Sequence, residues 1–298
     1  KEQELPDGNF STVRSPNPEE KDALTLALKQ AEREDADLVF GTDPDCDRIG
    51  AGVKHDGKYT LITGNQMGAL LVNFVLNMKK DSLNSKSTLV KTIVTSELGA
   101  NIARSFGLNV VETLTGFKYI GGEILALEEK GVENRFVFGF EESCGYLKGT
   151  YARDKDAVVA SMLTADLAAK LKREGMNLAD QIDALYAEFG CFCNAQKSFT
   201  FAGETGMEKM ASLMSGLRTH PLQSVAGLPV EGFTDYEQDG TGLPKANVLE
   251  YRLPGGAKLI IRPSGTEPKI KAYLSAVKPT VEEATRQLDT LAAAAAEL

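Results

Sequence analysis

Between residues 64 and 140 the chain alternates stretches of helix-like and strand-like patterning. Apolar residues recur at helical spacing in the first kind, and β-branched and aromatic residues dominate the second. The helical stretches are 66–78, 96–106 and 117–129, and the strand-like stretches are 88–95, 108–113 and 135–140. Strands that alternate with helices indicate a parallel, doubly wound sheet, whose ligands bind outside the carboxyl ends of the strands. We therefore predict an α/β domain whose binding loops follow its strands.

Shorter pieces are predicted on both sides of this domain. Before it come a helix at 19–34, a strand at 38–40 that leaves the sheet at Gly41, and an edge strand at 59–62. Helices at 157–174 and 178–189 complete the α/β domain. Beyond Gly190 we expect strands at 192–201, around 230, 248–253, 258–261 and 270–277, and helices at 204–217 and from 281.

These patterns predict the fold class. It is α/β, with a doubly wound, mostly parallel sheet domain preceded by a partial α/β domain and followed by a smaller α+β domain. The predicted divisions are 1–62, 63–190 and 191–298. The chain begins at Lys1 on a polar, turn-rich segment without an initiator Met, which favours a fragment of a longer protein.

The composition limits the kinds of partner that the protein can bind and the cellular compartment in which it is expected. The net charge of −9 argues against a nucleic-acid partner, which needs a basic surface, so an anionic substrate must be held by local cations. No secretory signal and no apolar run of membrane-spanning length occurs, so no membrane partner is expected. The four cysteines lack a disulfide-scaffold pattern and indicate thiols in a reducing cytoplasm.

Asp43, Asp45 and Asp47 stand at alternate positions directly after the first strand, and Arg48 follows them. Carboxylates this close repel each other unless a cation holds them, and Mg²⁺ prefers such oxygen ligands. A calcium EF-hand loop is excluded, because Arg48 and Lys54 occupy the positions that require Gly and Glu. A solvated acidic turn and a phosphatase-type aspartyl nucleophile remain as alternatives.

Two polar loops follow later strands of the α/β domain. The loop 113–122 brings Thr115 and Gly116 to a helix start, where an anion or a sugar hydroxyl can bind, although a plain helix cap explains the same residues. The loop 139–146 places Glu141 and Ser143 between glycines. Carboxylates and hydroxyls suit sugar hydroxyls, which need both donors and acceptors, and a polar turn is the alternative.

Two further segments carry cations. Arg153 and Lys155 open a helix, where positive charge opposes the helix dipole, so either a bound phosphate or neighbouring carboxylates must compensate. Near the end of the chain, two strands bracket R-P-S-G-T. Its phosphate-type donors are Arg262, Ser264, Gly265 and Thr266. A guanidinium fork, two hydroxyls and a glycine turn favour phosphate binding over a plain hairpin with a surface arginine.

Taken together, D-P-D-C-D-R, T-G-F-K, F-E-E-S and R-P-S-G-T resemble the α-D-phosphohexomutases, the phosphoglucomutase/phosphomannomutase family. The four motifs occur in the family's order, and their wording is most similar to the larger bacterial phosphoglucomutase branch. The resemblance spans the whole chain and implies the end of the family's second domain, its third domain and its fourth.

The resemblance implies a phosphotransferase that interconverts hexose 1-phosphate and hexose 6-phosphate through a phosphoserine and a bisphosphate intermediate. The implied roles are Mg²⁺ binding by Asp43, Asp45 and Asp47; catalysis by Arg48 beside the metal and Lys155 at the substrate; sugar contacts from Thr115, Gly116, Glu141 and Ser143; and a phosphate clamp of Arg262, Ser264, Gly265 and Thr266.

One departure from the family's pattern concerns the phosphoserine itself. The family carries it in a T-A-S-H-N-P-type loop of the first domain, and this sequence contains no such loop. We therefore expect a fragment whose partners are a glucose or mannose phosphate and the missing N-terminal serine domain. A non-catalytic sugar-phosphate-binding module and a Mg²⁺-dependent sugar phosphatase stay open as alternatives, as does a pentose phosphate as substrate.

Overall fold

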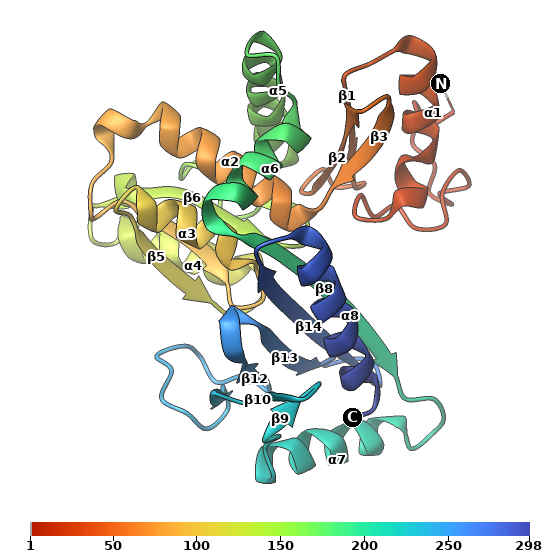
Figure 1. Cartoon of the computed structure of the whole chain (residues 1–298), viewed down its shortest axis with the longest axis vertical. Coiled ribbons are helices and arrows are strands. Elements are labelled where there is room, and N and C mark those ends of the chain that lie inside the picture. The colour runs from red at the N-terminus through yellow and green to blue at the C-terminus, as the bar shows by residue number, and fades with distance from the viewer. Residues whose placement is uncertain (1) are drawn as a thin grey trace. The chain divides into compact units, whose positions relative to one another are not determined.

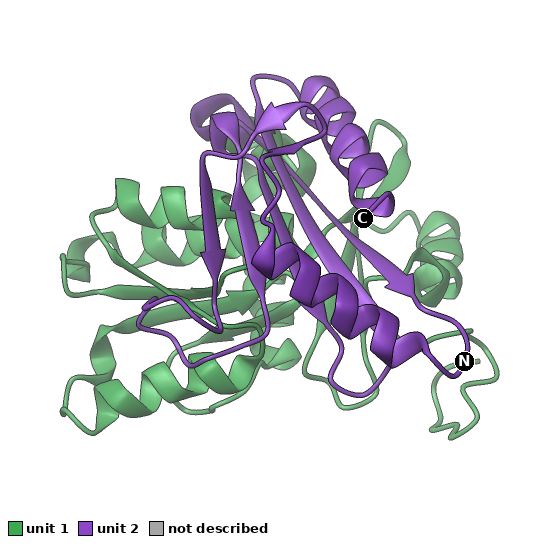
Figure 2. Cartoon of the chain, turned by 90° about the horizontal axis from the view of Figure 1, so that it is seen from below, with its two compact units in different colours: residues 1–185 green, residues 186–298 purple. Residues whose placement is uncertain are grey.

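The computed structural model describes residues 2–298 and divides into two compact units (Figures 1 and 2). Unit 1 ends at Leu185, and unit 2 comprises Tyr186–Leu298. The finer division into three domains at residues 62 and 190 stays a prediction. Within the described residues, no helix combines the length and hydrophobicity that crossing a bilayer requires.

Unit 1 begins with a helical segment and a small antiparallel sheet in the order β1-β2-β3. Its elements are η1 (Lys21–Leu24), α1 (Thr25–Glu34), β1 (Leu38–Thr42), β2 (Ile49–His55) and β3 (Lys58–Ile62). The helix and the edge strand β3 confirm the sequence prediction. β1 runs two residues further than predicted, because Gly41 pairs with Gly50 of β2, a strand that the sequence pattern did not indicate.

The second part of unit 1 contains a sheet in the order β5-β4-β6-β7, in which β4 is parallel to both β5 and β6. Its strands are β4 (Thr88–Thr92), β5 (Asn109–Thr113), β6 (Phe136–Glu141) and β7 (Gly145–Lys148). Its helical elements are α2 (Gly64–Met78), η2 (Lys80–Ser82), α3 (Glu97–Ser105), α4 (Phe117–Glu128), η3 (Glu133–Arg135) and α5 (Ala157–Arg173). The next helix, α6 (Leu178–Phe189), begins in unit 1 and ends in unit 2. The predicted doubly wound sheet is confirmed, with one antiparallel edge strand, β7, added.

Close packing of α2 and α3 against β6 fixes this sheet. Thr63 and Gln66 form a reciprocal capping box at the start of α2, whose side chains are apolar around most of the helix and are buried. Phe140 of β6 fills the space above two helical glycines. A Cβ at Gly68 would lie 2.3 Å from Phe140 Cδ2, and a Cβ at Gly99 would lie 2.7 Å from its Cζ. Glycine therefore lets both helices approach the strand that ends in Glu141.

Unit 2 is an antiparallel sheet with two long helices, as predicted for an α+β domain. The sheet order is β11-β12-β13-β14-β8, and Figure 1 shows α8 lying along β14 and β8. The elements are β8 (Cys191–Thr200), α7 (Gly206–Thr219), β9 (Ser224–Val225), β10 (Leu228–Pro229), β11 (Gly232–Asp235), β12 (Leu249–Arg252), η4 (Pro254–Gly256), β13 (Lys258–Pro263), β14 (Lys269–Lys278) and α8 (Val281–Ala296). Methionines and leucines of α7 and α8 pack on the apolar face of the sheet.

Candidate functional site

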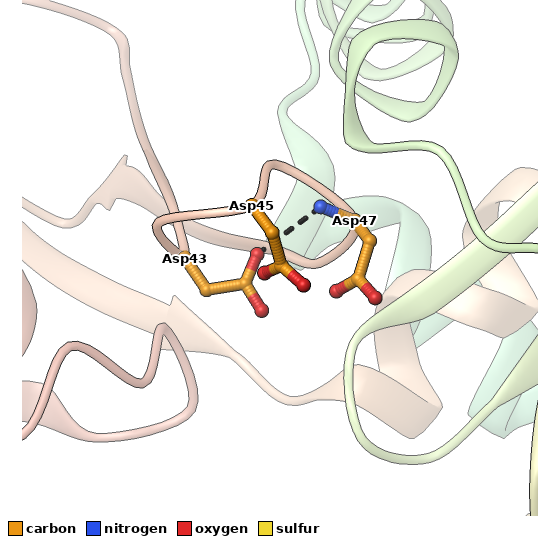
Figure 3. A group of neighbouring side chains, drawn as sticks. All are labelled: Asp43, Asp45 and Asp47. Atoms are coloured by element: carbon orange, nitrogen blue, oxygen red, sulfur yellow. Dashed lines mark hydrogen bonds between the residues drawn. The ribbon is translucent and has the colours of Figure 1, made fainter.

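The aspartate loop leaves the carboxyl end of β1 and curls around the Asp43 carboxylate. The backbone N–H groups of Asp47 and Arg48 both donate to Asp43 Oδ1, at 3.2 and 3.0 Å. Cys46 adopts a left-handed conformation at φ 58°, and its N–H donates to the Asp43 carbonyl. One oxygen from each of Asp43, Asp45 and Asp47 lies within 4.8 Å of the others, as Figure 3 illustrates. The three predicted metal ligands are therefore brought together.

Charge around this loop is only partly balanced. Asp43 is buried, and its carboxylate accepts a 2.6 Å hydrogen bond from Arg48 Nε. Burial alone would raise the pKa of Asp43, but the hydrogen bonds from Arg48 outweigh it and hold the pKa below its ordinary value. For Asp47, burial and the nearby Asp43 raise the pKa despite a bond from Lys155. The half-buried Asp47 carboxylate is therefore repelled by Asp43, and a bound cation would relieve this repulsion.

Two other predicted segments lie beside the aspartate loop. Ile49 N–H donates to the carbonyl of Cys144 at 3.1 Å, and Ala157 N–H donates to the carbonyl of Cys46 at 3.2 Å. Lys155 Nζ donates to Asp47 Oδ2 and also pairs with Asp154 Oδ1 at 3.2 Å. The F-E-E-S turn and the start of α5 are thus bonded directly to the metal-type loop. Lys155 has carboxylate partners and faces the cluster.

Glu141 is the last residue of β6 and is 4% exposed. Its Oε1 accepts a 2.7 Å hydrogen bond from the backbone N–H of Gly116, which joins the F-E-E-S and T-G-F-K loops. Burial, together with the charge of the neighbouring Glu142, raises the pKa of Glu141 to about 7. Thr115 Oγ1 is buried and has no hydrogen-bond partner among the described residues. Ser143 lies half-buried in the same turn.

A cleft of about 800 Å³ opens beside these loops within unit 1. Its walls include Asp45, Asp47 and Lys155 and also residues to which the sequence analysis assigned no role, such as Lys118 and Asp154. Arg153 lines the cleft and is paired with Glu128 of α4.

Sequence reasoning also missed Glu19, whose carboxylate lies 3.4 Å from Arg48 Nη1. Glu19 lies 29 residues before Arg48 in the sequence, so no local sequence pattern marks it as part of the site.

The predicted phosphate loop lies in unit 2, on the hairpin between β13 and β14. Arg262 and Ser264 are half-buried, and Gly265 and Thr266 are exposed. Ser264 Oγ accepts from the backbone N–H groups of Thr266 and Glu267, at 3.3 and 3.2 Å. Within residues 2–298, no side chain bonds the Arg262 guanidinium, which leaves its donors available for an anion.

The geometry defines a class of protein: an α/β protein in which three carboxylates that could hold a metal ion lie on a loop bonded to the turn after β6 and to the start of α5. Comparison with known families is consistent with this class. Residues 63–189 match the model of the phosphoglucomutase/phosphomannomutase α/β/α domain III, and residues 1–57 match that of domain II. The chain therefore belongs to the phosphoglucomutase/phosphomannomutase family, the α-D-phosphohexomutases.

Curated relatives agree with this assignment. A phosphoglucomutase from Staphylococcus aureus (strain MRSA252) is 36% identical over 96% of this chain and 53% of its own length. One from Staphylococcus saprophyticus is 34% identical over 97% of this chain and 54% of its own. The chain thus spans about half the length of the curated relatives that it matches.

Among solved structures, parafusin, a phosphoglucomutase from Paramecium, has a TM-score of 0.68 at 19% identity and covers 93% of this chain and 48% of its own. A phosphoglucomutase/phosphomannomutase family protein from Burkholderia thailandensis has a TM-score of 0.66 at 16% identity, over 97% and 52%. At these identities the two structures establish the shared fold.

Proposed function

We propose that this chain forms the metal-, sugar- and phosphate-binding part of a phosphohexomutase. That enzyme interconverts hexose 1-phosphate and hexose 6-phosphate through a phosphoserine and a bisphosphate intermediate. The observation that carries the proposal is that the loop of three aspartates is bonded to Lys155 and to the turn after β6, whose Glu141 in turn contacts Gly116. Family membership supports the reaction class.

The donor set fits Mg²⁺. All three candidate ligands are carboxylates, and Asp45 is exposed, so an ion has both hard oxygen donors and a path to them. Bound Mg²⁺ would supply neutralisation of the negative charge on a transferring phosphoryl group. Arg48 holds Asp43 in place through its Nε, and Lys155 offers an ammonium beside Asp47 that can pair with a substrate phosphate.

The sugar side of the proposed site consists of Glu141, Ser143, Thr115 and Gly116. Glu141 accepts from Gly116 N–H with one oxygen, which leaves its other oxygen for a sugar hydroxyl. The Thr115 hydroxyl, which has no partner within residues 2–298, adds a donor and acceptor next to Gly116. In unit 2, Arg262, Ser264, Gly265 and Thr266 form the proposed clamp for the phosphate that does not react. The loop's open guanidinium supports this role.

The covalent phosphoryl carrier is proposed to lie in a separate N-terminal serine domain, because the sequence has no T-A-S-H-N-P-type loop. Positioning and charge neutralisation alone do not replace an acceptor for the first phosphoryl group. We therefore propose that the chain alone binds hexose phosphate without interconverting it. From the thiol pattern of its four cysteines, we also propose that the enzyme acts in the cytoplasm. The same observation favours a second candidate, a non-catalytic sugar-phosphate-binding module.

Titration calorimetry tests the proposal with Mg²⁺, glucose 1-phosphate, glucose 6-phosphate, mannose 6-phosphate and inorganic phosphate as separate ligands. Mg²⁺-dependent binding of a hexose phosphate, tighter than that of inorganic phosphate, supports a sugar-phosphate site. Assays of the encoded full-length protein then separate the mutase from the module, since only the mutase interconverts the two glucose phosphates. Steady release of phosphate from glucose 1-phosphate by this chain would instead identify a Mg²⁺-dependent sugar phosphatase.

A further inference from the structure

The second glutamate of the F-E-E-S motif, Glu142, has contacts that its neighbour Glu141 lacks. Its Oε2 accepts from the hydroxyl of Thr95 at 3.1 Å and lies 3.4 Å from that of Thr92. The two hydroxyl oxygens are 2.8 Å apart. Each hydroxyl has one proton, so the shorter distances favour Thr92 donating to Thr95 and Thr95 donating to Glu142. Thr95 is thus the direct donor.

The two threonines are themselves fixed by a buried lysine. Lys91 is fully buried, and its Nζ donates to the carbonyls of Thr92 and Thr95, each at 3.3 Å. Its charge is balanced by Glu112 Oε1 at 2.6 Å and Glu97 Oε1 at 2.8 Å. A buried charge that is paired and fully hydrogen-bonded holds its partners in one geometry. The turn after β4 is therefore a rigid platform for the Glu142 carboxylate.

The backbone of Glu142 is held as well as its side chain. A Cβ at Gly64 would lie 1.9 Å from the Glu142 carbonyl oxygen, so the start of α2 packs directly on this peptide. Glu141 and Gly145 pair across the β6–β7 hairpin, which leaves three residues in the turn. With both ends paired and Glu142 anchored, little freedom remains for the peptide that carries Glu141.

We propose that Glu142, held by the Thr95 hydroxyl, is a positioning residue that fixes Glu141 against Gly116 and thereby shapes the sugar-hydroxyl side of the site. The role in sugar binding rests on the proposed function, whereas the positioning of Glu141 does not. Glu142 acts through Glu141 and is not itself a sugar ligand in this proposal.

The test uses Thr95→Val, which removes the donor at nearly constant shape, and Thr95→Ser, which keeps the donor. Thr164→Val is the matched control, because Thr164 is also fully buried in unit 1 but donates to the Ala160 carbonyl. The readout that needs no ligand is the Gly116 amide in ¹H–¹⁵N spectra and its hydrogen-exchange rate. We expect Gly116 to lose protection roughly tenfold in Thr95→Val, and to keep it in Thr95→Ser and Thr164→Val.

Glu142→Ala provides an independent route if Thr95→Val folds poorly. It should reproduce the Gly116 effect, and the double variant should add little to either single change, because all three break one contact. An unchanged Gly116 amide in Glu142→Ala or in folded Thr95→Val overturns the proposal. In Thr95→Val and Glu142→Ala the affinity for glucose 6-phosphate should fall about tenfold, whereas the affinity for Mg²⁺ should stay as in the parent. If the parent binds no hexose phosphate while Gly116 still responds, the proposed function fails and the positioning contact stands.

Discussion

The raised pKa of Glu141 makes a quantitative prediction about stability. In the folded chain this pKa is about 7, against an ordinary value of 4.5. Between these two values the folded state binds more protons at this group than the unfolded state, so stability falls as pH rises. A pKa difference of about 2.5 at about 1.4 kcal/mol per pH unit corresponds to roughly 3–4 kcal/mol, which is lost progressively as pH rises from the unfolded pKa through the folded pKa.

Glu141→Gln removes this titration while keeping an oxygen that accepts from Gly116. The assay is urea unfolding of parent and variant at pH 5 and pH 8, with Glu32→Gln on the exposed side of α1 as the matched control. Relative to the parent, the variant should gain roughly 2–3 kcal/mol between the two pH values, less than the full amount because pH 5 already lies above the unfolded pKa, whereas Glu32→Gln should track the parent. A parent–variant difference that does not change with pH would refute a buried, proton-binding Glu141.

Three other predictions concern the remaining parts of the site. Asp45→Asn should weaken Mg²⁺ binding at least tenfold by calorimetry, because a hard ion loses an anionic ligand; equal affinity would remove Asp45 from the metal site. Arg262→Ala should weaken binding of glucose 6-phosphate but not of glucose, since only the phosphate uses the guanidinium fork, and equal binding of the phosphate would make the loop structural. The chain alone, primed with a hexose bisphosphate, should show no interconversion of the two glucose phosphates in a coupled assay; robust turnover would mean that a serine of this chain carries the phosphoryl group.

The sequence by itself determined the features that depend on neighbours along the chain. Alternating helix and strand patterns predicted the parallel sheet because side-chain periodicity records which face is buried. The spacing of Asp43, Asp45 and Asp47 placed three carboxylates on one short loop, where few conformations separate them. The R-P-S-G-T hairpin was likewise predictable, since two strand-like runs bracket it. Strands β2 and β7 were not, because short or glycine-containing segments pair only when long-range partners supply the hydrogen bonds.

Only the tertiary structure decided how the loops meet. Lys155 reaches Asp47 across 108 residues, and Thr95 reaches Glu142 across 47, and no local pattern encodes either contact. The sequence likewise predicted a sugar-binding carboxylate at Glu141 but not its pKa, which depends on burial beneath loops from other strands. Local patterning sets which groups are present, whereas packing of distant segments excludes water from some of them and so sets their charge and geometry.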